Sequence, residues 1–169
     1  MRKSVIVVDI DGTTADSSRR LARLEGKPWP TTREGWAHWA EDMEDDPHIM
    51  WVIEIVHAMM KHGYRVVFVT AREEYMRSQT TQWIKKVFHP DHFTLWMREN
   101  DDRRPAAVSK LELIVTKIGL ENVFCALEDD LEVAKAFRKA GINVLHVADP
   151  VESPEAKHFA AKETTNVAQ

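Results

Sequence analysis

Cysteine and glycine are scarce in this sequence of 169 residues. The single cysteine, Cys125, cannot form an internal disulfide, and no cysteine and histidine cluster has the spacing of a zinc site. The six glycines occur singly, so the G-x-G-x-x-G loop of dinucleotide-binding proteins and the G-x-x-x-x-G-K-[ST] nucleotide-binding loop are both missing. The motifs G-x-S-x-G, H-E-x-x-H and C-x-x-C are missing too. These absences exclude most common catalytic and cofactor-binding signatures.

Long apolar runs and an excess of positive charge are also missing. The amino-terminal stretch MRKSVIVVDIDG has too short an apolar run for a signal-peptide core or a membrane span. The 23 Lys and Arg against 27 Asp and Glu give a net charge of −4, which argues against a general DNA-coating protein. A nucleic-acid role therefore requires a local basic patch. The sequence predicts one ordinary cytoplasmic domain that is long enough to bury a core.

Strand and helix patterns alternate along most of the chain. Residues 4–10 (SVIVVDI) are a β-branched run without polar alternation, which is typical of a strand buried on both faces of a parallel sheet. Similar runs predict further strands at 64–70, 93–97, 123–127 and 143–147. Helical spacing predicts helices at 48–62, 73–87, 108–118 and 131–140, three of them followed by Gly63, Gly119 and Gly141. This alternation predicts an α/β fold whose parallel sheet is covered on both sides.

Residues 13–47 interrupt the alternation and are too long for a simple connection, so we interpret them as an insertion. The acidic run at 41–46 is most simply a solvated linker to the next helix. Trp36 and Trp39 are three residues apart, which favours the apolar face of a small helix over stacking on a nucleobase. Residues 151–169 are predicted to be a polar C-terminal tail.

Polar residues follow the ends of the predicted strands. Ligands of open parallel sheets bind at the carboxyl ends of the strands, so these positions are candidates for a site. In chain order they are Asp9-Ile10-Asp11-Gly12-Thr13, Thr70-Ala71-Arg72, Lys110 in the helix after the third strand, and Glu128-Asp129-Asp130. Two carboxylates at a spacing of two leave a strand on the same side, and the glycine after them permits a sharp turn.

This set of residue types indicates phosphoryl transfer. The carboxylates of Asp9, Asp11 and Asp129 would repel one another unless a cation lay between them, and oxygen ligands suit Mg²⁺. The metal would neutralise part of a phosphate's charge and orient it for attack by one carboxylate. Thr70 and Lys110 would contact the phosphoryl oxygens, where charge develops in the transition state. The expected chemistry passes through an aspartyl-phosphate.

The D-x-D-G-T motif after a first hydrophobic strand, a Thr at the end of the next, a later Lys and an acidic pair resemble the haloacid dehalogenase (HAD) phosphatase superfamily. The resemblance implies a Rossmann-like core with a small helical cap inserted after the first strand. It implies that Asp9 is the nucleophile and that Asp11 is the acid/base, whose backbone carbonyl also binds Mg²⁺. Thr70 and Lys110 would hold the phosphate, and Asp129 would complete the metal site.

Two stretches, YRVVFVTAR and RENDDRRPAAVSK, resemble more closely the 3′-phosphatase domain of bacteriophage polynucleotide kinase/phosphatase, over residues 4 to about 148. The basic residues that match its pattern are Arg72, Arg98 and Arg104. Their common position at one end of the sheet favours binding of an anionic substrate. The chain departs from the family pattern at Ala106, where an acid is usual, and at Glu128-Asp129-Asp130, where Asp-Asp-Arg is usual. It contains no counterpart of the kinase half.

We therefore predict a Mg²⁺-dependent phosphomonoesterase with its core in residues 1–150, in which residues 13–47 form a cap that closes over the active site. The resemblance implies a phosphorylated nucleic-acid end as substrate, with a 3′-phosphate as the first choice. A nucleotidase acting on a nucleoside 5′-monophosphate is the second. A non-catalytic phosphate-binding module is the alternative of another class, and the intact Asp9 and Asp11 argue against it. No membrane partner is expected, and the sequence does not indicate an oligomeric state.

Overall fold

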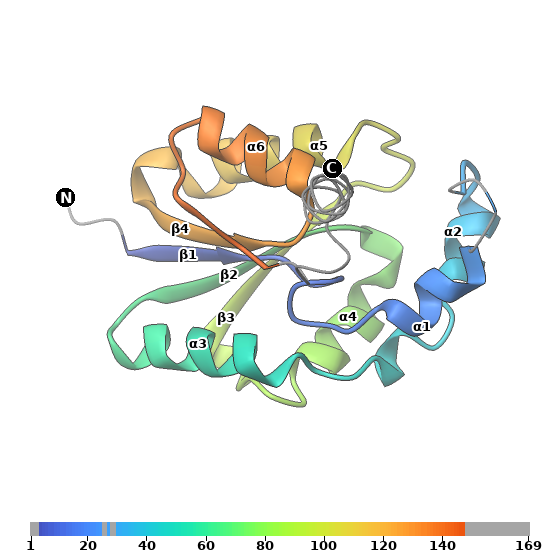
Figure 1. Ribbon diagram of the computed structural model, residues 1–169, viewed down its shortest axis with the longest axis horizontal. Coiled ribbons are helices and arrows are strands. Elements are labelled where there is room, and N and C mark those ends of the chain that lie inside the picture. The colour runs from blue at the N-terminus through green and yellow to red at the C-terminus, as the bar shows by residue number, and fades with distance from the viewer. Residues whose placement is uncertain (1–3, 25–26, 28–29, 148–169) are drawn as a thin grey trace, which may run out of the picture.

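Five parallel strands form the central sheet, in the order β3-β2-β1-β4-β5 (Figure 1). The computed structural model describes residues 4–24, 27 and 30–147. The strands are β1 (Val5–Val8), β2 (Arg65–Glu73), β3 (Phe93–Arg98), β4 (Val123–Glu128) and β5 (Val144–His146). The predicted parallel five-stranded sheet is confirmed. Because the first strand lies in the middle, its carboxyl end is flanked by the ends of β2 and β4, where polar residues were expected.

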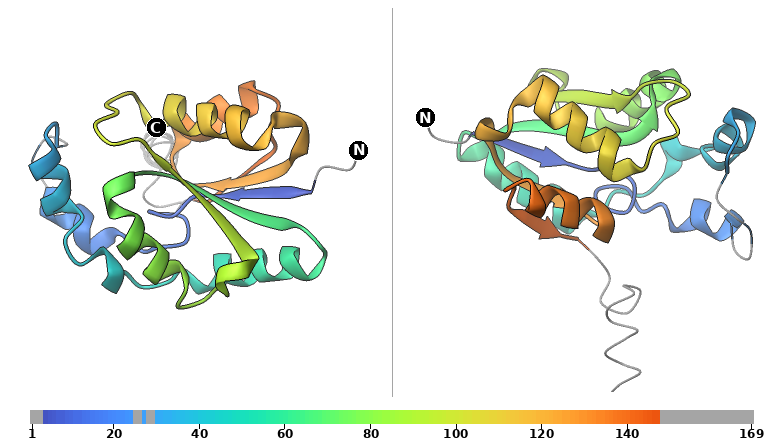
Figure 2. Two further views of the ribbon diagram at one scale, coloured as in Figure 1. Left: turned by 180° about the vertical axis from the view of Figure 1, so that it is seen from behind. Right: turned by 90° about the horizontal axis from the view of Figure 1, so that it is seen from above.

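Helices cover both faces of the sheet (Figures 1 and 2). On one face lie α3 (Met50–Lys61) and α4 (Arg77–Ile84), and on the other lie α5 (Ala106–Leu113) and α6 (Leu131–Lys139). A π-helical turn, Ile114–Ile118, extends α5, and short 3₁₀ turns occur at Glu74–Met76, Pro90–His92 and Leu120–Asn122. The predicted helix at 73–87 is wrong at its start, because β2 continues to Glu73 and a 3₁₀ turn precedes α4.

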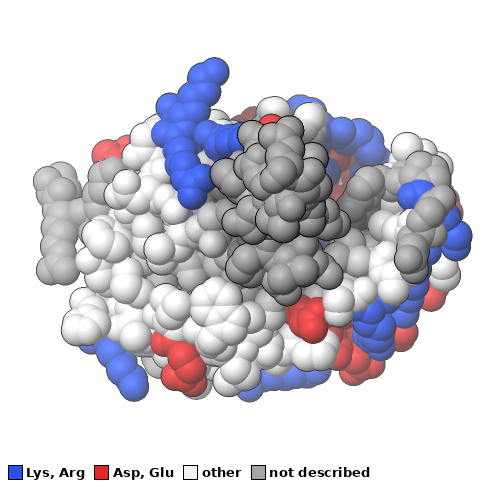
Figure 3. Space-filling model, in the orientation of Figure 1, with Lys and Arg blue, Asp and Glu red and all other residues white. Residues whose placement is uncertain are grey.

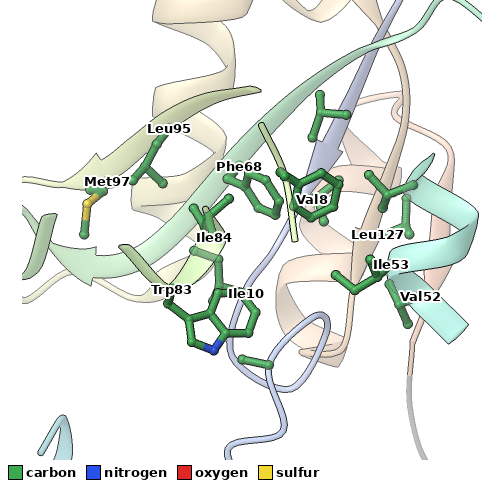
Figure 4. Close-up of a cluster of buried hydrophobic side chains, with 14 of the residues drawn as sticks. Val8, Ile10, Val52, Ile53, Phe68, Trp83, Ile84, Leu95, Met97 and Leu127 are labelled. Carbon is green, nitrogen blue, oxygen red and sulfur yellow. The ribbon is translucent and has the colours of Figure 1, made fainter. Parts of the chain in front are cut away.

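The side chains of β1 alternate between two buried apolar clusters. Ile6 and Val8 pack against α3 and α4, whereas Val5 and Val7 pack in the cluster with α5 and α6. Figure 4 shows the first cluster, in which Phe68 of β2 lies close to Val8. Each fully buried side chain of this size contributes roughly 1.5–3 kcal/mol to folding. The rigid sheet therefore positions the residues that follow β1 at its carboxyl end.

The three glycines expected to end helices have positive φ, of 84°, 82° and 84° at Gly63, Gly119 and Gly141. This conformation is common for the residue that follows a helix, and glycine adopts it without steric cost.

The insertion contains two short α-helices, α1 (Ser18–Leu21) and α2 (Arg33–Trp39), and 3₁₀ turns at Ala22–Leu24 and Met43–Asp45. Its two ends are joined, because the N–H of Asp16 donates to the carbonyl of Pro47 at 2.8 Å and that of Ile49 donates to Thr14 at 2.8 Å. In Figure 1, α1 and α2 lie beyond the carboxyl end of the sheet. The segment is thus an insertion that leaves the core and returns to it at one place, where its two ends are hydrogen-bonded to each other.

Two predictions for the insertion have different outcomes. The packing role of Trp39 is confirmed: its side chain belongs to the core cluster, and its ring meets that of Trp36 edge to face, with centroids 5.7 Å apart. The interpretation of residues 41–46 as a solvated linker is wrong at Met43 and Asp46, which are buried. Asp46 is buried because an arginine from α1 neutralises it. The predicted tail at 151–169 lies outside the described residues.

Charges of both signs mix on the surface. Figure 3 shows Lys and Arg interspersed with Asp and Glu toward the end of the molecule that carries α1 and α2. No helix in the described part of the chain is long and apolar enough to cross a membrane.

Candidate active site

A pocket of about 810 Å³ opens at the carboxyl ends of β1, β2 and β4. Ligand pockets of proteins typically have volumes in this range. All eight residues that the sequence predicts to be catalytic, metal-binding or substrate-binding line this pocket: Asp9, Asp11, Thr70, Arg72, Arg98, Arg104, Lys110 and Asp129. The topology explains this convergence, because the ends of adjacent parallel strands meet at one edge of the sheet.

The floor of the pocket holds an ammonium group between two carboxylates. The Nζ atom of Lys110 lies 2.7 Å from an oxygen of Asp9 and 2.9 Å from one of Glu128. All three side chains are at most 5% exposed. Burial alone would lower the pKa of Lys110, but the charges of Asp9 and Glu128 outweigh it and raise that pKa well above its usual value. Lys110 is therefore a permanent cation beside Asp9.

Three carboxylates form a cluster that could hold a metal ion: oxygens of Asp9, Glu128 and Asp129 lie within 4.8 Å of one another. Lys110 compensates only one of their three charges. Burial, followed by the charge of Asp9, raises the pKa of Glu128 to about 8 and that of Asp129 to about 7. Burial also raises the pKa of Asp9. When all three are ionised, these hard oxygen donors carry an uncompensated charge of about −2, which fits a divalent cation such as Mg²⁺.

Magnesium affinity is expected to increase as the pH rises from 6 to 8. Because the pKa of Asp129 is raised to about 7, a proton occupies part of the Asp129 carboxylates near neutrality without metal, and a cation must displace it. Calorimetric titration with Mg²⁺ in two buffers of different ionisation enthalpy measures the protons released. An Asp129→Asn variant should release fewer protons and bind more weakly. Affinity that stays constant over this pH range would contradict the proposed protonation.

The turn after β1 brings backbone close to Asp129. The carbonyl of Ile10 accepts the N–H groups of Thr13, Thr14 and Ala15 at 3.2, 2.9 and 2.7 Å. The hydroxyl of Thr13 donates to Asp129 at 2.9 Å and orients that carboxylate. Gly12 has a φ of +85°, and a Cβ atom there would lie 2.1 Å from an oxygen of Asp129. Only glycine fits this position without displacing Asp129.

Replacing Gly12 with alanine should lower the phosphatase activity that the sequence predicts about tenfold to hundredfold, since displaced residues around a metal site typically have effects of this size. Gly63→Ala is a matched control, because Gly63 has a φ of +84° but nothing lies within 4 Å of the added Cβ. Both variants should lose about 1–2 kcal/mol of stability from left-handed backbone. Only Gly12→Ala should lose activity and Mg²⁺ affinity, as measured by steady-state kinetics and calorimetry. Equal activity of the two variants would refute the steric argument.

Two arginines hold the carboxylate of Asp11. Arg72 donates to its two oxygens from Nε at 2.8 Å and from Nη2 at 2.7 Å, and Arg20 also donates to Oδ1. Burial alone would raise the pKa of Asp11, but the charges of Arg72 and Arg20 outweigh it and hold the pKa well below the usual range. The side chain of Asp11 is not part of the carboxylate cluster of Asp9, Glu128 and Asp129. The guanidinium of Arg72 is engaged by Asp11.

Arg20 joins the insertion to Asp11 in the loop after β1. Its side chain is completely buried, and its Nε donates to Asp46 at 2.7 Å. The guanidinium also lies over the ring of Trp39, 4.0 Å from the centroid. Sequence reasoning missed Arg20, because it lies in a segment with no recognisable motif and only the fold brings it to Asp11. Glu128, to which the sequence assigned no role, also lies within the carboxylate cluster.

Arg98, Arg103 and Arg104 line one wall of the pocket, and their partners differ. Arg104 pairs with Asp102 and Glu112 at 2.8 and 2.5 Å. Arg98 is half-buried and donates to the carbonyl of Asp102 at 3.2 Å. Its buried Nε has no hydrogen-bond partner in the described part of the chain, and burial lowers its pKa. Arg98 is therefore the arginine of this wall best placed to gain from an anionic ligand.

Comparison with known proteins places these features in context. Residues 3–150 match the family model described as the polynucleotide kinase PNKP phosphatase domain. A chain of the Pnkp1/Rnl/Hen1 RNA repair complex is similar, with 22% identity and a TM-score of 0.68 over 85% of this chain and 42% of that one. This chain therefore spans less than half the length of that protein. A comparison with curated protein sequences gave no match.

Two bacterial structures share the fold. The class C acid phosphatase from Bacillus anthracis with tungstate bound is 17% identical, with a TM-score of 0.60 over 89% of this chain and 68% of that one. A hydrolase of the haloacid dehalogenase-like family from Streptococcus pneumoniae is 15% identical, with a TM-score of 0.56 over 85% and 83%. At these identities the similarity shows a common fold.

Proposed function

The chain belongs to the family of polynucleotide kinase PNKP phosphatase domains, and from this premise we propose that it is a Mg²⁺-dependent polynucleotide 3′-phosphatase acting through an aspartyl-phosphate. Family and fold identify it as a HAD-type phosphatase, a hydrolase of phosphoric monoesters. One observation carries the finer proposal: the candidate nucleophile, acid/base, phosphate ligands and metal ligands all line one pocket.

Asp9 is the proposed nucleophile. In the first step its carboxylate oxygen bonds to phosphorus while the bond from phosphorus to the leaving oxygen breaks. Lys110 is held against Asp9 and can contact a phosphoryl oxygen from the same position. The hydroxyl of Thr70 accepts the N–H of Arg72 at 3.1 Å, so its own proton is the one to donate to the phosphate. When bound, Mg²⁺ would offset charge on the phosphoryl group, held by Asp9, Asp129 and the backbone carbonyl of Asp11.

Asp11 is the proposed acid and base. As an acid it gives a proton to the leaving oxygen, and as a base it takes one from the water that attacks phosphorus and releases phosphate from Asp9. The two arginines favour its carboxylate form, which is the base of the second step. Donation of a proton in the first step requires one arginine contact to loosen, and an anionic substrate can compete for that guanidinium.

The pocket walls support a nucleic-acid substrate. Arg98 and Arg104 lie on the core side, whereas Leu21, Trp36 and Trp39 line the pocket from residues 13–47, which we assign as the cap. A basic wall and an apolar wall suit a nucleotide, whose phosphates would contact the arginines and whose sugar and base would contact Leu21 and Trp36. The volume of about 810 Å³ also accommodates one nucleotide, so a mononucleotidase is the second candidate.

Steady-state kinetics test the proposal. The kcat/KM for hydrolysis of a 3′-phosphorylated oligonucleotide is compared with the values for nucleoside 3′-monophosphates, nucleoside 5′-monophosphates and sugar phosphates. The highest kcat/KM is expected for the oligonucleotide, and it should require Mg²⁺. A preference for a nucleoside 5′-monophosphate would favour the nucleotidase. Strong activity on a sugar phosphate with weak activity on both nucleotide classes would overturn the nucleic-acid assignment.

A further inference from the structure

An ion pair joins the cap to the opposite side of the pocket. Nη2 of Arg33, at the start of α2, lies 2.5 Å from a carboxylate oxygen of Asp101 in the loop between β3 and α5. The Arg33 guanidinium also lies 5.6 Å from the centroid of the Tyr75 ring. Figure 2 shows α2 and the β3–α5 loop at the same end of the molecule. We call the contact of Arg33 with Asp101 the rim bridge.

The rim bridge lies at the edge of the pocket. Trp36, one helical turn after Arg33, and Arg103, two residues after Asp101, both line the pocket, whereas the two bridge residues do not. Their side chains are 47% and 63% exposed. The bridge therefore connects the cap to the loop that carries the basic wall, at the solvent-exposed edge of the pocket.

The loop end of the rim bridge is anchored to the core. Asp101 has a φ of +65°, which residues other than glycine rarely adopt, and its N–H donates to Glu73 at 2.7 Å. The buried carboxylate of Glu73 also accepts Arg103 at 2.5 Å. The side chain of Asn100 accepts the N–H of Tyr75 at 2.9 Å. Glu73, at the end of β2, therefore holds the backbone of Asp101 in place.

The bridge itself is easily broken. An exposed ion pair contributes little in water and is screened by salt, so a pair of this kind shifts an open–closed equilibrium by a factor of about two to five. Opening needs only a movement of α2, because Asp101 is held by the core. The rim bridge is thus weak enough to break when a large ligand enters the pocket and to remain formed when a small ligand is bound.

We propose that Arg33 and Asp101 determine which length of phosphorylated nucleic acid enters the pocket. This inference rests on the proposed phosphatase function and names a specificity determinant for it. With the bridge closed, the pocket takes a terminal nucleotide alone. An oligonucleotide, whose chain continues beyond that nucleotide, must pass the rim, so only molecules with an open bridge bind it.

Two variants test the rim bridge: Arg33→Gln removes the cation, and Asp101→Asn removes the anion. Asparagine tolerates positive φ, so the loop backbone is retained. For each variant, kcat/KM on a 3′-phosphorylated oligonucleotide should rise about two- to fivefold. The value for a nucleoside 3′-monophosphate should stay within about twofold, since the terminal nucleotide fits below the rim.

A double-mutant cycle separates the bridge from general charge effects. The variant that carries both changes should match Asp101→Asn, because Asp101 also pairs with Arg103 at 3.3 Å and its removal opens the bridge whichever residue stands at position 33. Lys135→Gln is the control for loss of a surface cation, since Lys135 pairs with Glu132 on α6, away from the pocket. It should leave the ratio of the two kcat/KM values unchanged. Additive effects, an unchanged ratio in the bridge variants, or equal loss on both substrates would overturn the inference.

Binding provides a readout that does not depend on turnover. Fluorescence anisotropy of a labelled 3′-phosphorylated oligonucleotide, measured in an Asp9→Asn background, should show about two- to fivefold tighter binding when Arg33→Gln is added. A wild-type protein that hydrolyses no phosphomonoester would refute the proposed function. Oligonucleotide binding that is unchanged by Arg33→Gln would refute the rim bridge alone.

Discussion

Replacing Asp9 with asparagine is expected to abolish phosphatase activity, lowering kcat by at least about 10⁴-fold. The amide has almost the shape of the carboxylate but cannot form the bond to phosphorus. The fold should survive, because burial already makes the charged form of Asp9 costly and Lys110 keeps its contact with Glu128 at 2.9 Å. The melting temperature should therefore be unchanged or higher. Hydrolysis of an aryl phosphate and calorimetry measure the two quantities.

The control for Asp9→Asn is the same chemical change outside the pocket. Asp16 accepts the N–H of Ser18 at 3.0 Å, a contact that asparagine can also make. Asp16→Asn should therefore keep full activity. If Asp9→Asn hydrolysed the aryl phosphate as fast as the wild type, the aspartyl-phosphate mechanism would be wrong. If the wild type were also inactive on every phosphomonoester, a non-catalytic phosphate-binding module would replace the proposal.

Replacing Arg20 with glutamine should lower kcat about 10²- to 10³-fold with a smaller change in KM, the loss expected when general acid/base catalysis is impaired. Arg20 touches Asp11 and acts through it, so it is a positioning residue. Without Arg20, the carboxylate of Asp11 keeps the two-point contact with Arg72 but loses its second guanidinium, so its orientation and charge are less well fixed. Its pKa should rise toward the usual value, which moves the acidic limb of the pH–rate profile to higher pH.

Arg20→Gln should also destabilise the fold, by about 3 kcal/mol, because the buried carboxylate of Asp46 loses the guanidinium that donates to it and keeps only Arg19, 3.6 Å away. Part of this loss depends on pH. Since the two arginines lower the pKa of Asp11 in the folded state, ionised Asp11 stabilises the wild type above its unfolded pKa of about 4. The difference in unfolding free energy should be largest near pH 7 and decrease below about pH 4. Denaturant titrations over this range measure it.

Two further variants keep the Arg20 prediction testable. Arg20→Lys retains the cation but not the planar fork, so it should recover most of the stability and little of the activity. Arg19→Gln changes the neighbouring arginine, whose side chain is 46% exposed, and should leave the pH profile unchanged. Full activity of Arg20→Lys would show that charge alone matters at this position. An unshifted profile in Arg20→Gln would refute the positioning role.

The sequence alone determined the fold class and eight of the residues that line the pocket. The β-branched run before Asp9 marks a strand buried on both faces, and parallel strands bring their carboxyl ends to one edge. Residues at those ends, such as Thr70 and Asp129, could therefore be named from local spacing. Gly12 could be named too, because a tight turn after the strand demands its backbone freedom. These features depend on residues close together in the chain.

Only the tertiary structure decided how the charges are paired. Arg20 reaches Asp46, which is 26 positions away, and Arg33 reaches Asp101, which is 68 positions away. Whether a charged side chain is solvated or buried depends on the partner that the fold supplies, because an unpaired charge is expelled from the interior. Asp46 looked like part of a solvated run for this reason, and its burial follows from an arginine that no local pattern connects to it.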